Sequence, residues 1–359
     1  MTLLITNDDV ARVISMESCI EMLEQAFVDL EVGKAADRPR ARTFTHMRHG
    51  LSYMFSSMDG SLPRHGVHGI RLTSGHVRTR EPDSGNQTTS RQLPASGPGD
   101  SYVGLIMIFS LEDLVPLAIL HDSVCNRYMV GATSAIAAKY LARAESHSVG
   151  LIGTGWLAGA QLLGLSEVRP IDRVKVAGRS RNRKESFCKE WAGRLGIEVL
   201  PVDDARAAVD GVDIIACATN SYEPVLRGAW LEPGQHVGSV IGWEIDYEVL
   251  ERAFILSCRS VEQDSIWFSR GPTPLDYANQ KVLPPWLAHK NEGLGEIILG
   301  RSGRRTEQDI TFHGGGGTGA SSGLGIQELA VAYHVYREVA KRGLGREVPT
   351  EWFLETSHP

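Results

Sequence analysis

The chain has 359 residues, and 37 Lys and Arg against 43 Asp and Glu give it a net charge of −6. Because the chain has no excess of basic residues, its charge does not indicate nucleic acid as a partner. The longest apolar run, at 103–109, is too short to span a membrane. The length predicts two domains. The N-terminus lacks the pattern of a signal peptide, and five scattered cysteines are typical of a reduced, cytoplasmic protein.

The first third of the chain predicts one helix followed by short strands. Residues 15–33 carry apolar side chains at helical spacing. Residues 40–75 alternate in polarity, which predicts antiparallel strands. Three glycines interrupt them and shorten the predicted strands: Gly50, Gly60 and Gly69. The polar stretch at 78–100 predicts a mobile surface loop.

The rest of the chain alternates between strands and helices. Strands at 103–109 and 117–120 precede a helix of small residues at 131–144. Six short apolar strands then follow, at 149–152, 174–177, 198–202, 213–218, 236–241 and 254–258. Helical patterns separate most of them, which predicts an α/β fold with a doubly wound parallel sheet. A glycine-rich run after about 310 leads into a last helix at 325–342.

A glycine motif joins the first of these strands to the next helix. Residues 149–159 match G-x-G-x-x-A, with Gly153, Gly155 and Ala158 at the fixed positions. Gly153 permits a tight turn, and Gly155 lets the backbone approach a pyrophosphate at the helix N-terminus. The motif predicts a Rossmann dinucleotide site; the alternative is a glycine turn that binds no ligand. The predicted cofactor contacts on this turn are Gly153, Thr154, Gly155, Trp156 and Leu157.

The end of the second strand indicates which dinucleotide is bound. An acidic residue there would bond the ribose 2′-hydroxyl of NAD, but residues 177–183 contain no acid. They contain Arg179, Ser180 and Arg181, which suit the 2′-phosphate of NADP through charge-assisted hydrogen bonds. The sequence therefore predicts NADP(H) rather than NAD(H). The alternative is that these arginines belong to a solvated loop.

Further motifs carry a family resemblance. They are Val-Gly-Ala-Thr-Ser at 130–134, the strand 213–219, Pro-Gly-Gln-His at 233–236 and the segment 343–350. With the glycine turn, they make the chain resemble the ornithine cyclodeaminase/mu-crystallin family over nearly its whole length. The resemblance implies a homodimer of two-domain subunits. It implies a Rossmann domain at 126–314 and an α+β substrate-binding and dimerisation domain at 1–125, rejoined by 315–359.

The resemblance also implies hydride transfer between a nicotinamide and the Cα of an amino or imino acid. Arg42 matches the arginine that holds the substrate carboxylate, and Met54 lies on the adjacent substrate-binding strand. Arg71 falls where the family has a lysine. It can clamp a carboxylate but cannot give up a proton near neutral pH. Thr219 matches a nicotinamide-side threonine, and Ser322 a substrate-side serine.

Other positions depart from the family pattern around the expected proton transfer. The acidic residue after the fifth strand falls on Trp243, which we expect to form a wall of the substrate pocket. Val240, in the same segment, is a predicted cofactor contact. Glu244 follows Trp243 and is one candidate for proton transfer. His76, in a predicted loop beside Arg71, is the other.

These departures decide between the family's activities. The family's arginine before the T-G-A motif falls on Met129. Without the usual lysine and acid, the proton shuttle that a cyclodeaminase needs is lost. The resemblance therefore implies an NADP(H)-dependent oxidoreductase acting on the C–N bond of an imino or amino acid. The alternatives are an ornithine cyclodeaminase-type lyase that uses NAD and a non-catalytic, mu-crystallin-like NADPH-binding protein. The histidines show no metal-ligand spacing, so no metal is expected.

Overall fold

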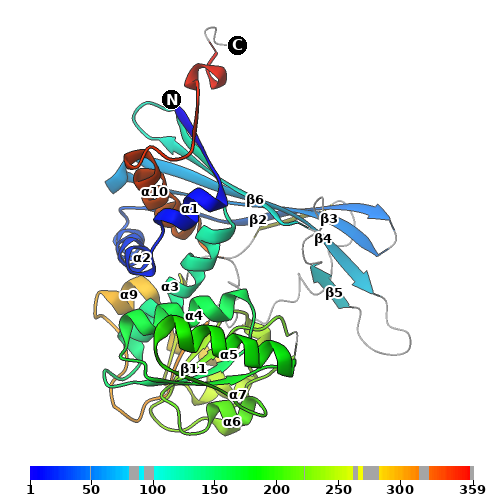
Figure 1. Cartoon of the computed structure of the whole chain (residues 1–359), viewed down its shortest axis with the longest axis vertical. Coiled ribbons are helices and arrows are strands. Elements are labelled where there is room, and N and C mark those ends of the chain that lie inside the picture. The colour runs from blue at the N-terminus through cyan, green and yellow to red at the C-terminus, as the bar shows by residue number, and fades with distance from the viewer. Residues whose placement is uncertain are drawn as a thin grey trace.

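A computed structural model of the chain describes residues 1–48, 50–80, 89–92, 101–221, 223–261, 266–269, 283–314 and 323–355. Two β-sheets with helices packed against them form the described part of the molecule (Figure 1). One sheet gathers nine strands, mostly from the first third of the chain, and the other gathers eight strands from the remainder. No described helix is long and apolar enough to cross a membrane.

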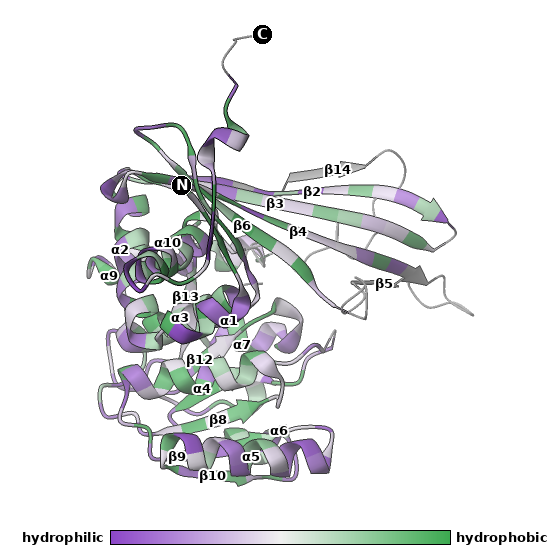
Figure 2. Ribbon diagram, turned by 45° about the horizontal axis from the view of Figure 1, so that its top comes forward, coloured by the Kyte–Doolittle hydropathy of each residue, from purple (hydrophilic) through white to green (hydrophobic). Residues whose placement is uncertain are grey.

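The nine-stranded sheet is mixed. Its strands are β1 (Thr2–Ile5), β2 (Ala36–Arg48), β3 (Leu51–Leu62), β4 (Val67–Arg80), β5 (Thr89–Gln92), β6 (Val103–Ser110), β7 (Pro116–His121), β14 (Ile266–Ser269) and β17 (Arg346–Val348). They follow the order β14-β2-β3-β4-β6-β7-β1-β17, with β5 paired to β4. The pairs β14–β2 and β1–β7 are parallel, and the remaining described pairs are antiparallel. The far ends of β2, β3 and β4 project beyond the helices (Figure 2).

The long strands correct the prediction of short ones. β2, β3 and β4 have 13, 12 and 14 residues, and two of the three glycines lie inside them. A Cβ on Gly60 would lie 2.8 Å from Ile326, and one on Gly69 would lie 2.6 Å from Leu329. Both partners belong to α10 (Gly325–Lys341). These glycines therefore let a helix lie close to the sheet, whereas Gly50, with φ of 68°, forms the predicted turn.

The predicted loop at 78–100 also contains strand. Residues 78–80 end β4, and residues 89–92 form β5, which pairs with it. Residues 81–88 and 93–100 lie outside the described part of the chain.

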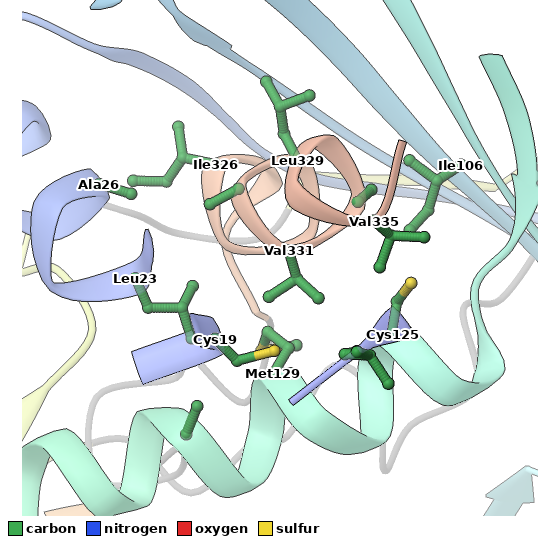
Figure 3. Packing of buried hydrophobic residues seen from close by; sticks show 14 of the residues in the cluster. Cys19, Leu23, Ala26, Ile106, Cys125, Met129, Ile326, Leu329, Val331 and Val335 are labelled. Carbon is green, nitrogen blue, oxygen red and sulfur yellow. The ribbon is translucent and has the colours of Figure 1, made fainter. Parts of the chain in front are cut away.

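Three further helices pack with α10 beneath this sheet. They are α1 (Asn7–Val13), α2 (Met16–Glu31) and α3 (Ser123–Leu141). Leu23 of α2, Met129 of α3 and Ile326 of α10 point into one buried core (Figure 3). The predicted helices at 15–33 and 325–342 are thus confirmed, while α3 begins eight residues before the predicted small-residue helix.

The second sheet is wholly parallel in its described pairs. Its strands are β8 (Ser148–Ile152), β9 (Arg173–Ala177), β10 (Glu198–Pro201), β11 (Ile214–Cys217), β12 (His236–Ser239), β13 (Ile255–Cys258), β15 (Asn291–Gly293) and β16 (Thr311–Gly314). Their order is β10-β9-β8-β11-β12-β16-β13-β15. This confirms the predicted α/β fold with a Rossmann-type sheet and a second α+β part.

Helices and a hydrophobic core lie on each face of the parallel sheet. The helices are α4 (Trp156–Val168), α5 (Arg181–Leu195), α6 (Ala205–Val209), α7 (Tyr247–Arg252) and α9 (Leu294–Ile298). Leu151 packs in a cluster with Leu162 of α4 and Trp191 of α5. The next residue, Ile152, belongs to a separate cluster that contains Val249 of α7. Successive side chains of β8 thus pack into the hydrophobic cores on opposite faces of the sheet.

The chain passes between the two sheets more often than expected. After β13 it adds β14 to the edge of the nine-stranded sheet beside β2, where Trp267 is in register with Arg42. It then returns to the parallel sheet as β15. The domain division predicted from the sequence contains no such excursion, and its boundaries remain a prediction.

Candidate functional site

The glycine turn between β8 and α4 leaves an open space at a helix N-terminus. Gly153 has φ of 124°, and a Cβ there would lie 2.3 Å from the carbonyl oxygen of Ala218. Only glycine fits this position without strain. Gly155 is the N-cap of α4, and a Cβ there would meet nothing within 4 Å. The unobstructed backbone N–H groups of α4 therefore fit a pyrophosphate group.

The other residues predicted on this turn have different surroundings. The methyl group of Thr154 lies 2.9 Å from where a Cβ of Gly178 would be, so Thr154 faces the end of β9. The ring of Trp156 is half exposed and lies under the Arg127 guanidinium, 5.5 Å from the ring centroid. Leu157 and Val240, both predicted cofactor contacts, pack against the hydrophobic cores.

Close packing of α4 on α5 depends on a glycine that carried no predicted role. A Cβ on Gly159 would lie 2.2 Å from the Trp191 ring of α5. Gly159 follows the buried Ala158 of the motif, so both residues keep α4 close to its neighbours. A small residue next to the motif is the signal that could have indicated this role.

The basic residues after β9 separate into two kinds. Arg179 Nη2 donates to Asn220 Oδ1 at 3.2 Å, which places its guanidinium above the carboxyl ends of β9 and β11. Ser180 is the N-cap of α5, and its hydroxyl accepts a backbone N–H of that helix. Arg181 is exposed and pairs with Glu185 at 2.8 Å along α5. Of the two predicted arginines, Arg179 is therefore the one at the nucleotide edge of the sheet.

Glu244 ties together the loops that follow β11 and β12. Its side chain is fully buried and accepts hydrogen bonds from the backbone N–H of Thr219, the backbone N–H of Ile241 at 3.1 Å and the hydroxyl of Ser239 at 3.1 Å. Burial raises the pKa of Glu244, although the bonds from Thr219 oppose the shift. Both carboxylate oxygens of Glu244 accept hydrogen bonds, so its side chain holds the backbone at Thr219 in place. Trp243, the residue before it, is half-buried.

The predicted substrate residues of the nine-stranded sheet share one face. Arg42 is opposite Ser56, Met58 is opposite Arg71, and Met54 lies on the same side of β3 as Met58. Directly opposed residues point to the same face of a sheet, and alternate residues of one strand do so too. Gly60, two residues after Met58, faces Ile326 of α10, so Arg42, Met54 and Arg71 all point toward the side that α10 covers.

His76 is not brought to this face. It was predicted in a loop beside Arg71, but both residues belong to β4, and five positions along a strand place them on opposite faces. The ring of His76 packs edge-on against Tyr53, with 6.4 Å between the ring centroids. The prediction that His76 lies in a loop beside Arg71 is therefore wrong. Ser322, the predicted substrate serine, lies outside the described residues.

Arg71 is held in a buried network that has no counterpart in the sequence predictions. Its Nε donates to Asp122 Oδ2 at 2.7 Å, its Nη1 to Glu328 Oε1 at 2.8 Å and its Nη2 to the Tyr102 hydroxyl at 3.2 Å. Asn126 also donates to Glu328 Oε1, at 2.9 Å. Burial alone would lower the pKa of Arg71, but the Glu328 and Asp122 carboxylates raise it. Arg71 is therefore a permanent cation whose charge two carboxylates offset.

Further arginines gather around Arg71. Arg40 Nη2 lies 3.6 Å from Met58 Sδ, on the same face as Arg71 and Arg42. Burial, together with the Arg42 and Arg71 guanidinium groups, lowers the pKa of Arg40. Arg259, which directly follows β13 of the parallel sheet, also acts electrostatically on Arg40. We call Arg40, Arg42, Arg71 and Arg259 the arginine cluster. It draws residues from both sheets, and such a concentration of guanidinium groups suits carboxylate ligands.

Metal-binding side chains are not grouped in the described residues. There, no set of three His, Cys, Asp or Glu side chains could hold a metal ion. Met129, at the position of the family's arginine, is buried in the core (Figure 3).

Comparisons with known proteins agree with this fold. The chain matches the description of the ornithine cyclodeaminase/mu-crystallin family over residues 1–343. The alanine dehydrogenase of Archaeoglobus fulgidus is 28% identical over 360 residues, covering 97% of this chain and 98% of that protein. The structure of the Thermococcus litoralis Δ1-pyrroline-2-carboxylate reductase, in complex with NADH and L-proline, is 28% identical with a TM-score of 0.76, covering 97% of this chain and all of that one.

An archaeal alanine dehydrogenase dimer with bound NAD is also similar, with a TM-score of 0.75 at 26% identity over 97% of this chain and 99% of that one. The match to the family includes α10 and every described strand of the two sheets except β17. The chain therefore belongs to the ornithine cyclodeaminase/mu-crystallin family.

Proposed function

We propose that the protein is an NADP(H)-dependent oxidoreductase that acts on the C–N bond of an imino or amino acid. The observation that carries the proposal is the arginine cluster: Arg42 and Arg71 share one face of the nine-stranded sheet, and Arg259, which follows β13, acts electrostatically on Arg40 beside them. Ligands of open parallel sheets bind at the carboxyl ends of the strands. A carboxylate bound at the cluster would thus lie next to a cofactor bound on the parallel sheet.

A nicotinamide dinucleotide would supply the hydride when it is bound. The N-terminus of α4 behind Gly155 would hold its pyrophosphate, and the loop that Glu244 anchors at Thr219 would border the nicotinamide half. The two similar structures contain NADH and NAD. Our preference for NADP(H) rests on Arg179 and on the lack of an acid between 177 and 183.

The substrate would be held by its carboxylate and protonated by a neighbouring acid. We assign the carboxylate to Arg42 and Arg71, of which Arg71 is fixed in place by its own network. Glu328 is the acid next to Arg71. Its Oε1 accepts two hydrogen bonds, whereas its buried Oε2 has no hydrogen-bond partner within the described part of the chain, and burial raises the pKa of Glu328. In the free protein Glu328 is the carboxylate that pairs with Arg71; when a substrate carboxylate adds a further negative charge beside it, Oε2 would take up a proton and donate it to the imine nitrogen.

The experiment is a turnover assay with NADPH and two substrate types. Δ1-pyrroline-2-carboxylate tests cyclic imines, and pyruvate with ammonia tests an imine formed in solution. We expect loss of NADPH absorbance and an amino acid product identified by mass spectrometry. Release of ammonia from ornithine would instead indicate a cyclodeaminase. Tight NADPH binding without turnover of any imino acid would indicate a binding protein.

A further inference from the structure

Arg40 differs from Arg71 in how its charge is accommodated. Asp122 and Glu328 both pair with Arg71. The described hydrogen bond of Arg40 goes to the thioether sulfur of Met58, a weak acceptor, and the buried Arg40 Nε has no hydrogen-bond partner among the described residues. Arg40 is half-buried, and Glu328 offsets part of its charge electrostatically, but a guanidinium nitrogen buried without such an acceptor is costly. The geometry of Arg40 is therefore that of a group prepared for an anion.

The head of Arg40 lies where the sheet meets the start of α10. A Cβ on Gly323, just before that helix, would be 3.8 Å from Arg40 Nη2 and 3.5 Å from Met129 Cε. Arg40 thus reaches across from β2 toward α3 and α10, next to the region that Arg71 and Glu328 occupy. Met129 supplies an apolar surface beside Arg40. We therefore expect Arg40 to be the residue that binds a charged group here.

Arg40 and Arg42 are spaced along one strand. Both contact or oppose residues on the same face of β3, since Arg40 contacts Met58 and Arg42 is in register with Ser56. The pairing of β2 with β3 shifts register between Arg38 and Ala41, so Arg40 lies at this irregularity, two residues before Arg42. Each guanidinium can therefore take a different carboxylate of one small ligand.

We propose that Arg40 binds a second acidic group, so that the preferred substrate is an imino or amino acid whose side chain carries a carboxylate. This inference rests on the proposed function, in which Arg42 takes the first carboxylate. Arg40 is then the residue that determines specificity, and it selects for the side chain of the substrate.

The first test compares two four-carbon 2-oxo acids, oxaloacetate and 2-oxobutyrate, each with ammonia and NADPH. The oxo acid and ammonia lose water to form the imine, which gains a hydride from NADPH and a proton to give the amino acid. We expect the wild type to favour oxaloacetate. Arg40→Gln should lower kcat/KM for oxaloacetate by about ten- to a hundredfold relative to kcat/KM for 2-oxobutyrate. Arg40→Lys should restore part of the loss.

The matched control is Arg38→Gln, because Arg38 lies in the same strand but pairs with Asp59. It should leave the preference between the two substrates unchanged. Unaltered NADPH affinity in all three variants would show that they are folded. Equal use of the two oxo acids by the wild type, with no effect of Arg40→Gln, would overturn the inference and leave the proposed function intact.

A binding measurement tests Arg40 without turnover. By calorimetry, NADPH-loaded protein should bind succinate at least about tenfold more tightly than butyrate, and Arg40→Gln should remove the difference. If no imino acid were turned over but succinate binding still depended on Arg40, the proposed function would fail and the diacid site would stand. Equal binding of succinate and butyrate would reject the diacid site.

Discussion

Arg71 Nη1 donates to Glu328 Oε1 at 2.8 Å, although the two residues are 257 positions apart in the chain. The same guanidinium binds Asp122, which stands between β7 and α3. One cation thus joins a strand, a helix near the C-terminus and a strand–helix junction. Because these groups hold one another, the face of the sheet at the arginine cluster is ordered before a substrate arrives.

Arg71→Ala should destabilise the fold as well as reduce turnover. The substitution leaves the buried Asp122 and Glu328 carboxylates without their cation, which costs about 3–5 kcal/mol in similar pairs. Urea unfolding measures the loss. Arg71→Lys keeps one charge but loses the planar fork, so its loss should be intermediate. Unfolding free energies for Arg71→Ala within about 1 kcal/mol of the wild type would show that the network contributes little.

Two alanine substitutions on the glycine turn should affect different properties, one the stability of the protein and the other its binding of NADPH. Gly153→Ala should lower the free energy of unfolding by about 1–3 kcal/mol, because φ is positive and the new Cβ would lie 2.3 Å from the Ala218 carbonyl oxygen. Gly155→Ala should leave stability nearly unchanged, since its Cβ meets nothing within 4 Å. It should instead weaken NADPH binding, because the methyl group enters the space expected for the pyrophosphate.

Thermal unfolding and fluorescence titration with NADPH separate these two effects. If Gly155→Ala bound NADPH as tightly as the wild type, the cofactor would not approach the turn as proposed.

The cofactor preference should depend on Arg179. We expect NADPH to bind at least about tenfold more tightly than NADH, a difference of about 1.4 kcal/mol. Arg179→Asp should reverse the preference, because a carboxylate repels a 2′-phosphate and accepts from a 2′-hydroxyl. Arg181→Ala, at the arginine that pairs with Glu185, is the matched control and should have a smaller effect. Equal affinity of the wild type for both cofactors would remove the NADP assignment.

Acid should destabilise the protein through His236. Burial, with Arg304 and Arg169 nearby, lowers the pKa of His236 to about 3, and its Nδ1 lies 2.9 Å from the Thr311 hydroxyl. The folded state therefore keeps this imidazole neutral, while the unfolded chain takes up a proton below its ordinary value of 6.5. Stability from this group is complete above that value and is lost as the pH falls toward the folded pKa.

His236 should contribute a slope of about 1.4 kcal/mol per pH unit to the dependence of the unfolding free energy on pH below about pH 6. Urea unfolding at about pH 7 and about pH 5 tests it, and His236→Gln should show a flatter dependence. The same slope in the variant would assign the acid sensitivity to other groups.

Assembly is the last prediction. Val103 and Leu105 of β6 are exposed on the face of the nine-stranded sheet opposite the arginine cluster, and Phe55 of β3 lies across β4 from Val103. We propose that this face forms a homodimer, so light scattering should give about twice 39.2 kDa. Leu105→Glu should yield monomers, because a carboxylate is costly to bury. A monomeric wild type would contradict the proposal.

The parallel sheet was readable from the sequence because its strands are buried on both faces. Such strands are short apolar runs between turns, and the glycine motif marks the first of them. The long antiparallel strands were harder to predict. Gly60 and Gly69 have the same local signal as a turn glycine, and only the later contact with α10 shows that they make room for a helix.

The site was only partly predictable, because its partners are distant in the chain. Glu328 gave one local signal, as a charged residue between the buried Ile326 and Leu329 of an apolar helix. Its partner Arg71 could not be identified from that pattern. Arg40 received no role because the family resemblance assigned the substrate carboxylate to Arg42, and the sequence pattern does not show that Arg40 lacks a carboxylate partner of its own.

The excursion of the chain into β14 bears on whether the two halves are separable modules. β14 covers the edge of β2, yet it is encoded between two strands of the parallel sheet. A fragment that ends at residue 125 would expose the unpaired backbone groups of β2, and open strand edges invite aggregation. A graft of the nucleotide-binding half onto another protein would include β14 without its partner strand β2. The enzyme is therefore best engineered as one indivisible chain, with substitutions made in place.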